Sequence, residues 1–152
     1  MMNKRKEQIK NEMKLRLPSL SVNESVARSA VAAFCAQLDP SASELADIKC
    51  VVSEAVTNCI VHGYRDVVGM IYITVVLYAN GSVKIEIRDK GVGIEDVKAA
   101  RQPLYTTDAE SERSGMGFTV MESFTDRIRV TSKPDKGTNV IMYKRLTGKE
   151  GL

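Results

Sequence analysis

Two alternating segments on either side of Asn80-Gly81 constrain the fold more than any other part of this sequence. Asn-Gly is a preferred dipeptide for a two-residue hairpin turn, and alternation with a period of two puts the apolar residues of a strand on one face. The apolar positions are Ile71, Ile73, Val75 and Leu77 before the turn, and Val83, Ile85 and Ile87 after it. Charged residues alternate with them in the second segment, so we expect an antiparallel hairpin with one buried and one wet face.

The rest of the chain predicts helices and a second hairpin rather than strict strand–helix–strand alternation. Ser21 with Glu24, and Ser41 with Glu44, have the spacing of capping boxes that begin helices. The expected elements are a strand over 13–17, helices over 21–38 and 42–62, a short helical stretch over 95–100, a helix from Gly117, and strands over 127–132 and 138–144. This order is typical of an α+β two-layer sandwich, in which helices cover one face of a mixed, largely antiparallel sheet. A doubly wound parallel sheet is disfavoured.

The composition fits one globular domain. The chain has 152 residues, of which 43% are hydrophobic and 27% charged, enough for a single core. No apolar run reaches the about 20 residues that span a bilayer, and the first residues lack the apolar core of a signal peptide. We therefore expect a cytoplasmic protein that does not contact a membrane, with a basic leader over 1–10, a domain over 11–146 and a tail over 147–152.

Neither a nucleic-acid site nor a zinc site is indicated. The first 16 residues hold six Lys or Arg and two Glu, but no aromatic residue lies between these charges to stack on bases. This favours a solvated leader without direct nucleic-acid binding. The three cysteines, Cys35, Cys50 and Cys59, have no C-x-x-C spacing, and the chain has one histidine. They are therefore interpreted as small buried hydrophobic residues.

Glu54 and Asn58 lie four residues apart in the longest predicted helix, so their side chains stack along one face. An apolar stripe lies nearly opposite, made of Leu45, Ile48, Val52, Ala55 and Cys59. A solvent-exposed polar face would explain this pattern on its own. A ligand-binding face would also explain it, because Asn is a poor helix former and a carboxamide oxygen is a hard ligand suited to Mg²⁺.

Two glycine-containing segments follow, and each is a weak signal alone. In the first, Asp89 ends a predicted strand, and Gly91 and Gly93 allow backbone conformations or a close ligand approach that a Cβ would prevent. In the second, Gly115 and Gly117 lead into a helix, whose first N–H groups could face an anion. Arg113 and Ser114 precede these glycines, and the arginine could add a charge-assisted contact to phosphate. Ordinary loops would explain either segment equally well.

In this order, the three segments resemble the motifs of the GHKL superfamily, named for gyrase, Hsp90, histidine kinases and MutL. Longer stretches are similar to the anti-sigma-factor serine kinases of spore-forming bacteria, over about residues 11–145. These are N-E-S-V-A-R-S-A-V-A-A-F-C-A-Q-L-D-P (Asn23–Pro40), S-E-A-V-T-N-C-I-V-H-G-Y (Ser53–Tyr64), A-R-Q-P-L-Y-T-T (Ala100–Thr107) and E-R-S-G-M-G-F-T-V-M-E-S-F (Glu112–Phe124). The resemblance implies a Bergerat-type ATP-binding fold that binds ATP, ADP and Mg²⁺.

The resemblance also implies a role for each matching residue. Glu54 would be the general base, Asn58 the Mg²⁺ ligand, and Asp89 the acceptor for the adenine amine. Thr138, after Gly137, would support Asp89. The segment Arg101–Arg113 would form a mobile cover over the phosphates. The other implied nucleotide-binding residues are Gly91, Gly93, Thr106, Thr107, Arg113, Ser114, Gly115, Met116 and Gly117.

The implied function has two parts, and both involve protein partners. A kinase of this type binds an RNA-polymerase sigma factor and phosphorylates a serine on an anti-anti-sigma protein, and the nucleotide state decides which partner is held. The expected assembly is a homodimer. Arg28 on the first helix is a candidate docking residue for a partner, and a solvated surface arginine is the alternative.

Other functions remain open on the sequence alone. A general-stress type of anti-sigma kinase has the same superfamily motifs, and a nucleotide-gated binding module without significant catalysis would also use them. The segments Gln102–Thr107 and Ser114–Phe118 favour the sporulation type. An ATPase that drives conformational work is disfavoured, because no transducer domain follows Lys144.

Overall fold

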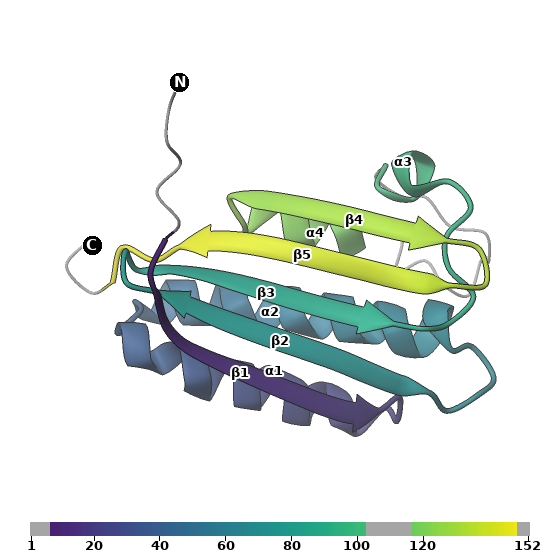
Figure 1. Cartoon of the computed structure of the whole chain (residues 1–152), viewed down its shortest axis with the longest axis horizontal. Coiled ribbons are helices and arrows are strands. Elements are labelled where there is room, and N and C mark those ends of the chain that lie inside the picture. The colour runs from purple at the N-terminus through teal and green to yellow at the C-terminus, as the bar shows by residue number, and fades with distance from the viewer. Residues whose placement is uncertain (1–6, 103–116, 149–152) are drawn as a thin grey trace.

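The computed structural model describes residues 7–102 and 117–148, which form a single five-stranded sheet with helices packed on one face (Figure 1). The strands are β1 (Ile9–Pro18), β2 (Met70–Tyr78), β3 (Ser82–Asp89), β4 (Arg127–Lys133) and β5 (Gly137–Arg145). The helices are α1 (Asn23–Cys35), the 3₁₀ turn η1 (Ala36–Leu38), α2 (Ala42–Asn58), the π-helical turn η2 (Cys59–Gly63), α3 (Val97–Ala100) and α4 (Gly117–Ser123).

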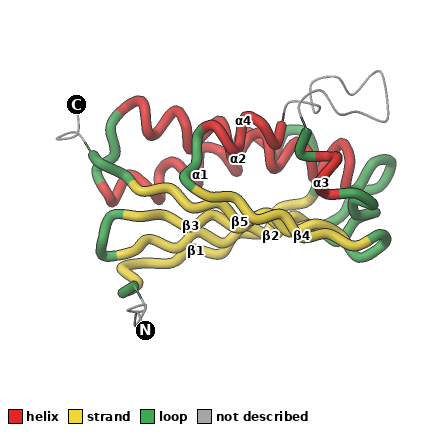
Figure 2. The backbone as a smooth tube through the Cα atoms, turned by 90° about the horizontal axis from the view of Figure 1, so that it is seen from above, coloured by secondary structure: helices red, strands yellow, loops and turns green. Residues whose placement is uncertain are grey.

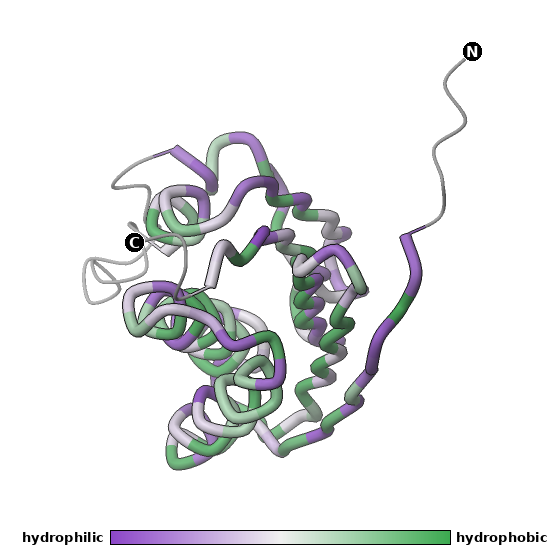
Figure 3. The backbone as a smooth tube through the Cα atoms, turned by 90° about the vertical axis from the view of Figure 1, so that its left-hand side faces the viewer, coloured by the Kyte–Doolittle hydropathy of each residue, from purple (hydrophilic) through white to green (hydrophobic). Residues whose placement is uncertain are grey.

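The strand order is β1-β2-β3-β5-β4, and each of the four pairings is antiparallel. Figure 2 shows α1, α2 and α4 together on one side of the sheet, and Figure 3 shows the helices and the sheet from the side. The predicted α+β two-layer sandwich is therefore confirmed. The sheet is simpler than the mixed one we expected, because both hairpins and the β1–β2 and β3–β5 pairings are antiparallel.

The antiparallel hairpin predicted around Asn80-Gly81 is confirmed as β2 and β3. Ile73 pairs with Ile87 and Val75 with Ile85, and all four side chains are buried beneath the helices. The helix α2 faces them with Ile48, Val52 and Ala55. Burial of a large aliphatic side chain contributes about 1.5–3 kcal/mol, so this contact between α2 and the central strands supplies much of the stability of the fold.

One of the two predicted capping boxes is present. The Ser41 hydroxyl accepts the Glu44 N–H at 3.1 Å, and Glu44 accepts the Ser41 N–H at 2.9 Å. The box predicted for Ser21 and Glu24 is wrong, because Glu24 turns toward α2 instead. Its Oε1 accepts the Ser53 hydroxyl and lies 3.3 Å from Nε of Arg28, so these tertiary contacts compete successfully for the carboxylate.

Two element boundaries also differ from expectation. The strand β1 starts at Ile9 rather than Met13, because its N-terminal half continues to pair with β2 as far as Tyr78. The helix expected over 42–62 is α-helical only to Asn58 and then widens into η2. Such π-helical turns occur frequently at functional sites. No helix within residues 7–102 and 117–148 is long and apolar enough to cross a bilayer.

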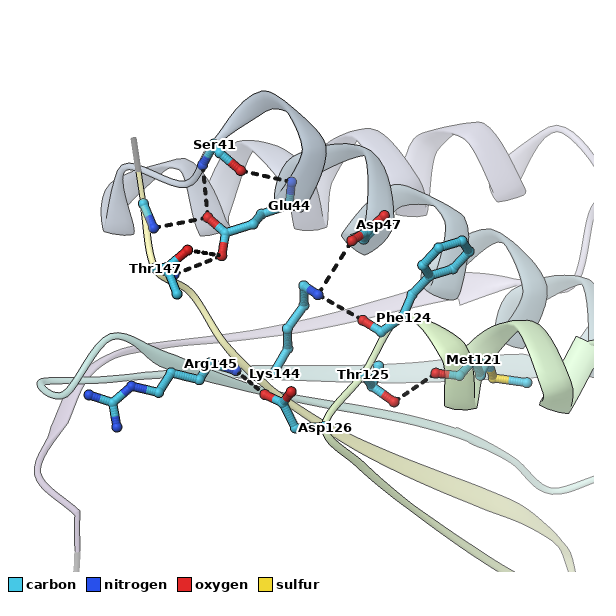
Figure 4. A network of polar contacts seen from close by, with 11 residues as sticks. Ser41, Glu44, Asp47, Met121, Phe124, Thr125, Asp126, Lys144, Arg145 and Thr147 are labelled. Atoms are coloured by element: carbon cyan, nitrogen blue, oxygen red, sulfur yellow. Dashed lines mark hydrogen bonds and ion pairs between the residues drawn. The ribbon is translucent and has the colours of Figure 1, made fainter. Parts of the chain in front are cut away.

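The end of β5 is tied to the start of α2 by a polar network centred on Glu44 (Figure 4). The Glu44 carboxylate accepts the N–H groups of Thr147 at 2.7 Å and Gly148 at 2.9 Å as well as that of Ser41. Burial alone would raise the pKa of Glu44, but these N–H donors and the Ser41 hydroxyl outweigh it, and the pKa is lowered. The ionised carboxylate therefore stabilises the folded chain.

We predict that Glu44→Gln lowers the free energy of unfolding by about 1–2 kcal/mol near neutral pH, because glutamine keeps one acceptor oxygen and places its NH₂ group against an N–H donor that the carboxylate accepts. The pKa of Glu44 is lower in the folded chain, so its contribution is present above the ordinary value of 4.5 and is lost as the pH falls through the folded value. Urea denaturation at several pH values should show the difference from wild type shrinking in acid. Glu95→Gln, at an exposed position, is the matched control, and an equal loss in both variants would contradict the assignment.

Candidate functional site

Glu54 and Asn58 lie where α2 meets the start of α4. Val51, Val52, Ala55 and Val56 face the core and are almost fully buried. The side chains of Glu54 and Asn58 are half-buried instead of being fully exposed to solvent. A Cβ built on Gly117 would lie 3.3 Å from both Glu54 Oε2 and Asn58 Nδ2. The polar face of α2 therefore lies against the first residue of α4, and a side chain at 117 would crowd it.

Burial raises the pKa of the Glu54 carboxyl. A raised pKa makes the carboxylate a stronger proton acceptor than a fully hydrated one. Glu54 is therefore suited to act as a general base.

Asp89 ends β3, as expected, and is 4% exposed. Burial raises the pKa of Asp89, and three donors oppose that rise without cancelling it. They are the Gly91 N–H at 2.9 Å from Oδ1, the Cys59 thiol and the Thr138 N–H. The carboxylate is thus hydrogen-bonded to the loop after β3 and packed against Gly63 at the end of η2.

The glycines of this region are required by backbone packing. A Cβ on Gly91 would lie 2.0 Å from the Gly63 carbonyl oxygen, and one on Gly93, where φ is +76°, would lie 2.0 Å from the Lys133 carbonyl oxygen. The sequence left open whether Gly91 and Gly93 serve the backbone or a ligand. At both positions the backbone alone excludes a side chain. Gly63 itself lies under Asp89, since its Cβ would be 2.8 Å from Asp89 Cγ.

Tyr64 ties this loop to the end of η2. Its hydroxyl donates to the Met70 carbonyl at 2.6 Å and accepts the Lys90 N–H at 2.7 Å. The Val92 N–H also donates to the Gly63 carbonyl at 2.9 Å. The sequence reasoning missed Gly63 and Tyr64 as site residues. The available signal was their position shortly after Asn58, at the end of the same predicted helix.

Thr138 lies opposite Asp89 in the β3–β5 register, where its hydroxyl is 2.8 Å from the Ser132 hydroxyl. Arg28 is on α1, with its side chain 41% exposed and its Nε beside Glu24. Arg101 donates through Nε to Glu122 on α4 at 2.8 Å. The remaining predicted site residues lie outside the described part of the chain: Thr106, Thr107, Arg113, Ser114, Gly115 and Met116.

The described residues fit a magnesium nucleotide better than a metal held by protein alone. Residues 7–102 and 117–148 contain no group of three His, Cys, Asp or Glu side chains that could hold an ion. Mg²⁺ commonly takes one or two protein oxygens, with phosphates and water completing its octahedron. The Asn58 carboxamide beside Gly117, with no side chain at 117 to fill the space, suits that arrangement.

The chain matches the model of the histidine kinase-like ATPase domain over residues 17–144. This match covers most of the sequence, including every described residue of the site. Two solved structures share the fold at low identity. One contains the RsbU and RsbW domains of Rv1364c from Mycobacterium tuberculosis, with a TM-score of 0.66 and 22% identity over 90% of this chain and 32% of that one. The other is the histidine kinase domain of the Erythrobacter litoralis EL346 blue-light activated histidine kinase, with a TM-score of 0.55 and 17% identity over 82% of this chain and 61% of that one.

Relatives of high sequence identity show which family of these ATPase domains the chain resembles most. The anti-sigma F factor of Priestia megaterium is 53% identical over 145 residues, which are 95% of this chain and 99% of the relative. That of Thermoanaerobacter sp. (strain X514) is 56% identical over 134 residues, 88% of this chain and 93% of the relative. The chain therefore belongs to the anti-sigma F factor family, within the histidine kinase-like ATPase domains.

We predict that Tyr64→Phe destabilises the fold by about 1–3 kcal/mol, because it leaves the Lys90 N–H and the Met70 carbonyl without their buried partner. It should also weaken nucleotide binding, since Lys90 adjoins Asp89. Urea denaturation and titration with a fluorescent ATP analogue measure the two effects. The matched control is Tyr72→Phe, because the Tyr72 hydroxyl makes no hydrogen bond to any described residue while its ring contacts Arg88 and Lys90. Equal behaviour of the two variants would contradict the prediction.

Proposed function

We propose that this protein is a Mg-ATP-dependent serine kinase that also inhibits a sporulation sigma factor. The observation that carries the proposal is the continuity of α2 and η2. Glu54 and Asn58 lie on α2 beside Gly117, and η2 continues the same helix to Gly63, which packs against the Asp89 carboxylate. One rigid element therefore relates the proposed base and metal ligand to the proposed adenine-binding acid.

Each residue has a distinct task in the proposed reaction. Asp89 accepts a hydrogen bond from the exocyclic amine of adenine, which orients the nucleotide. Asn58 contributes its carboxamide oxygen to Mg²⁺, and the ion neutralises charge on the phosphates during transfer. Glu54 accepts the proton of the attacking serine hydroxyl, a role that its half-buried position and raised pKa favour. Gly117 leaves room for the phosphates, and Thr138 supports Asp89 from β5.

The partners follow from family membership and belong to the same proposal. The sigma factor is bound and kept from transcription, and the anti-anti-sigma protein is inactivated by phosphorylation on serine. ATP and ADP states select between these partners, the protein acts as a homodimer, and the setting is the cytoplasm. Arg28 is the proposed docking residue. Its support is the ion pair with Glu24, which also accepts a hydrogen bond from Ser53, the neighbour of Glu54.

The central experiment mixes the purified protein with Mg-ATP, the candidate sigma factor and the candidate antagonist. Size-exclusion chromatography with light scattering follows the dimer and its complexes, and mass spectrometry follows phosphoserine. We expect both a sigma complex and a phosphorylated antagonist. Absence of phosphotransfer with retained nucleotide-dependent binding would favour the binding module, and transfer only to a general-stress antagonist would favour that type of kinase.

We predict that Glu54→Gln abolishes most phosphotransfer, by about 100-fold or more, and leaves ATP affinity within about threefold, because the carboxamide keeps the shape but cannot accept the proton. Phosphoserine formation and ATP titration measure the two properties. Asp47→Asn, two turns earlier on α2 and paired with Lys144, is the matched control and should retain activity. Full activity in Glu54→Gln would remove this residue from the base assignment.

We predict that Asp89→Asn relaxes the preference for ATP over GTP, because the replacement removes the charge and adds a donor beside the amine of adenine. Competition of ATP and GTP against a fluorescent nucleotide gives the preference directly. Asp126→Asn is the control, since that carboxylate accepts the Arg145 N–H at the far end of the sheet. A wild-type preference in Asp89→Asn would overturn the adenine assignment.

A further inference from the structure

Ser132 is a half-buried residue of β4 whose hydroxyl uses every hydrogen-bonding position that it has. It accepts the Ile94 N–H at 2.8 Å, donates to the Gly137 carbonyl at 2.9 Å and lies 2.8 Å from the Thr138 hydroxyl. A serine hydroxyl has one hydrogen to donate and two lone pairs that accept. These three partners therefore saturate it.

The chemistry of two of these partners fixes the direction of the third contact. An amide N–H can only donate, and a carbonyl oxygen can only accept. The single proton of Ser132 therefore points to Gly137, and the Thr138 hydroxyl donates its own proton to Ser132. Because that proton is committed, Thr138 Oγ1 offers only acceptor lone pairs to any other group.

Thr138 lies in one row with Ser132 and Asp89 across three strands. It is paired with Ser132 on β4 and with Asp89 on β3, and side chains paired in antiparallel strands share one face, with Cβ atoms about 4.5–5.5 Å apart. This is the helix-covered face, since Val140 and Ile87, two residues along, are buried in the core. Thr138 itself is only half-buried. Its acceptor therefore lies beside the Asp89 carboxylate at the same end of the sheet.

The Ser132 hydroxyl also joins the β4–β5 hairpin to the loop after β3, where the two segments are in close contact. The Asp135 N–H donates to the Val92 carbonyl at 2.7 Å. A Cβ on Gly137, where φ is +99°, would lie 2.1 Å from the Asp89 carbonyl oxygen, so the two backbones touch. The contact of Ser132 comes from a side chain, so a substitution can remove it without changing the backbone.

We propose that Ser132 is a positioning residue for nucleotide selectivity, which accepts the proton of Thr138 in a hydrogen bond and so presents the Thr138 hydroxyl to the base as an acceptor. With Asp89 beside it, the site offers two acceptors, which suit the two hydrogens of the adenine amine and disfavour the carbonyl oxygen of a 6-oxopurine. The inference rests on the proposed function of Asp89 and Thr138 in binding adenine. It adds that the choice between amine and carbonyl depends on Ser132, which need not touch the nucleotide.

The test compares ATP with inosine triphosphate, which carries a carbonyl oxygen in place of the amine. Competition against a fluorescent nucleotide gives the affinity ratio, and wild type should favour ATP. In Ser132→Ala the Thr138 hydroxyl is free to turn its proton toward the carbonyl, so we expect the ratio to fall roughly 3- to 10-fold, the equivalent of one hydrogen bond. Ser132→Thr keeps a hydroxyl and should retain most of the ratio. A general loosening of the site would weaken both nucleotides equally, and that unchanged ratio in Ser132→Ala would overturn the inference.

Amide hydrogen exchange tests the same arrangement without nucleotide. Ser132→Ala removes the acceptor of the Ile94 N–H, so exchange at Ile94 should become faster than in wild type. Thr131→Ala is the matched control, because Thr131 precedes Ser132 on β4 and lies opposite Asn139 on the other face of the sheet. It should leave both the exchange rate and the affinity ratio at their wild-type values. Unchanged exchange at Ile94 in Ser132→Ala would count against the inference, and so would a ratio in Ser132→Thr no higher than in Ser132→Ala.

Thr138→Val and Asp89→Asn separate this inference from the proposed function. If both variants lower the ratio and Ser132→Ala does not, the adenine assignment stands and only the role of Ser132 fails. If Asp89→Asn lowers the ratio and Thr138→Val does not, Ser132 has no group to act through, and the inference fails in the same way. If neither variant lowers the ratio, the assignment of adenine to this end of the sheet fails as well.

Discussion

The close approach of η2 to the end of β3 is the contact on which the rest of the site depends. The carbonyl of Gly63 lies where a Cβ of Gly91 would be, and the Asp89 carboxylate lies over Gly63 itself. Side chains at either glycine would push the helical layer from the sheet at this end. The geometry of the site is therefore a direct result of how tightly the two layers pack there.

The turn η2 joins α2 to this packing. It begins after Asn58, the Tyr64 N–H donates to the Cys59 carbonyl at 2.9 Å, and the Gly63 carbonyl accepts the Val92 N–H of the loop after β3. Tyr64 then fastens the same loop through Lys90. Three consecutive features of one short segment, a π-helical turn, a glycine and a buried tyrosine, thus hold Asp89 at a fixed place relative to α2.

Local patterns predicted most of the fold, since the period-two alternation around Asn80-Gly81 and the Ser41–Glu44 capping box depend on near neighbours. The Ser21–Glu24 box failed because the carboxylate found Ser53 and Arg28, which only the tertiary structure brings near it. For the site, the spacing of Glu54 and Asn58 placed them correctly on one face of α2. It could not show that Gly117 covers that face, because the contact joins residues about sixty positions apart.

The order of strands leaves β1 and β4 at the two edges of the sheet, within the part of the chain that the structure describes. Each edge carries exposed cations, Lys14 and Arg16 on β1 and Arg127, Arg129 and Lys133 on β4. Charged edges oppose the addition of a further strand, because like charges would meet and lose hydration. Growth into an extended sheet by addition of further strands at either edge is thereby discouraged.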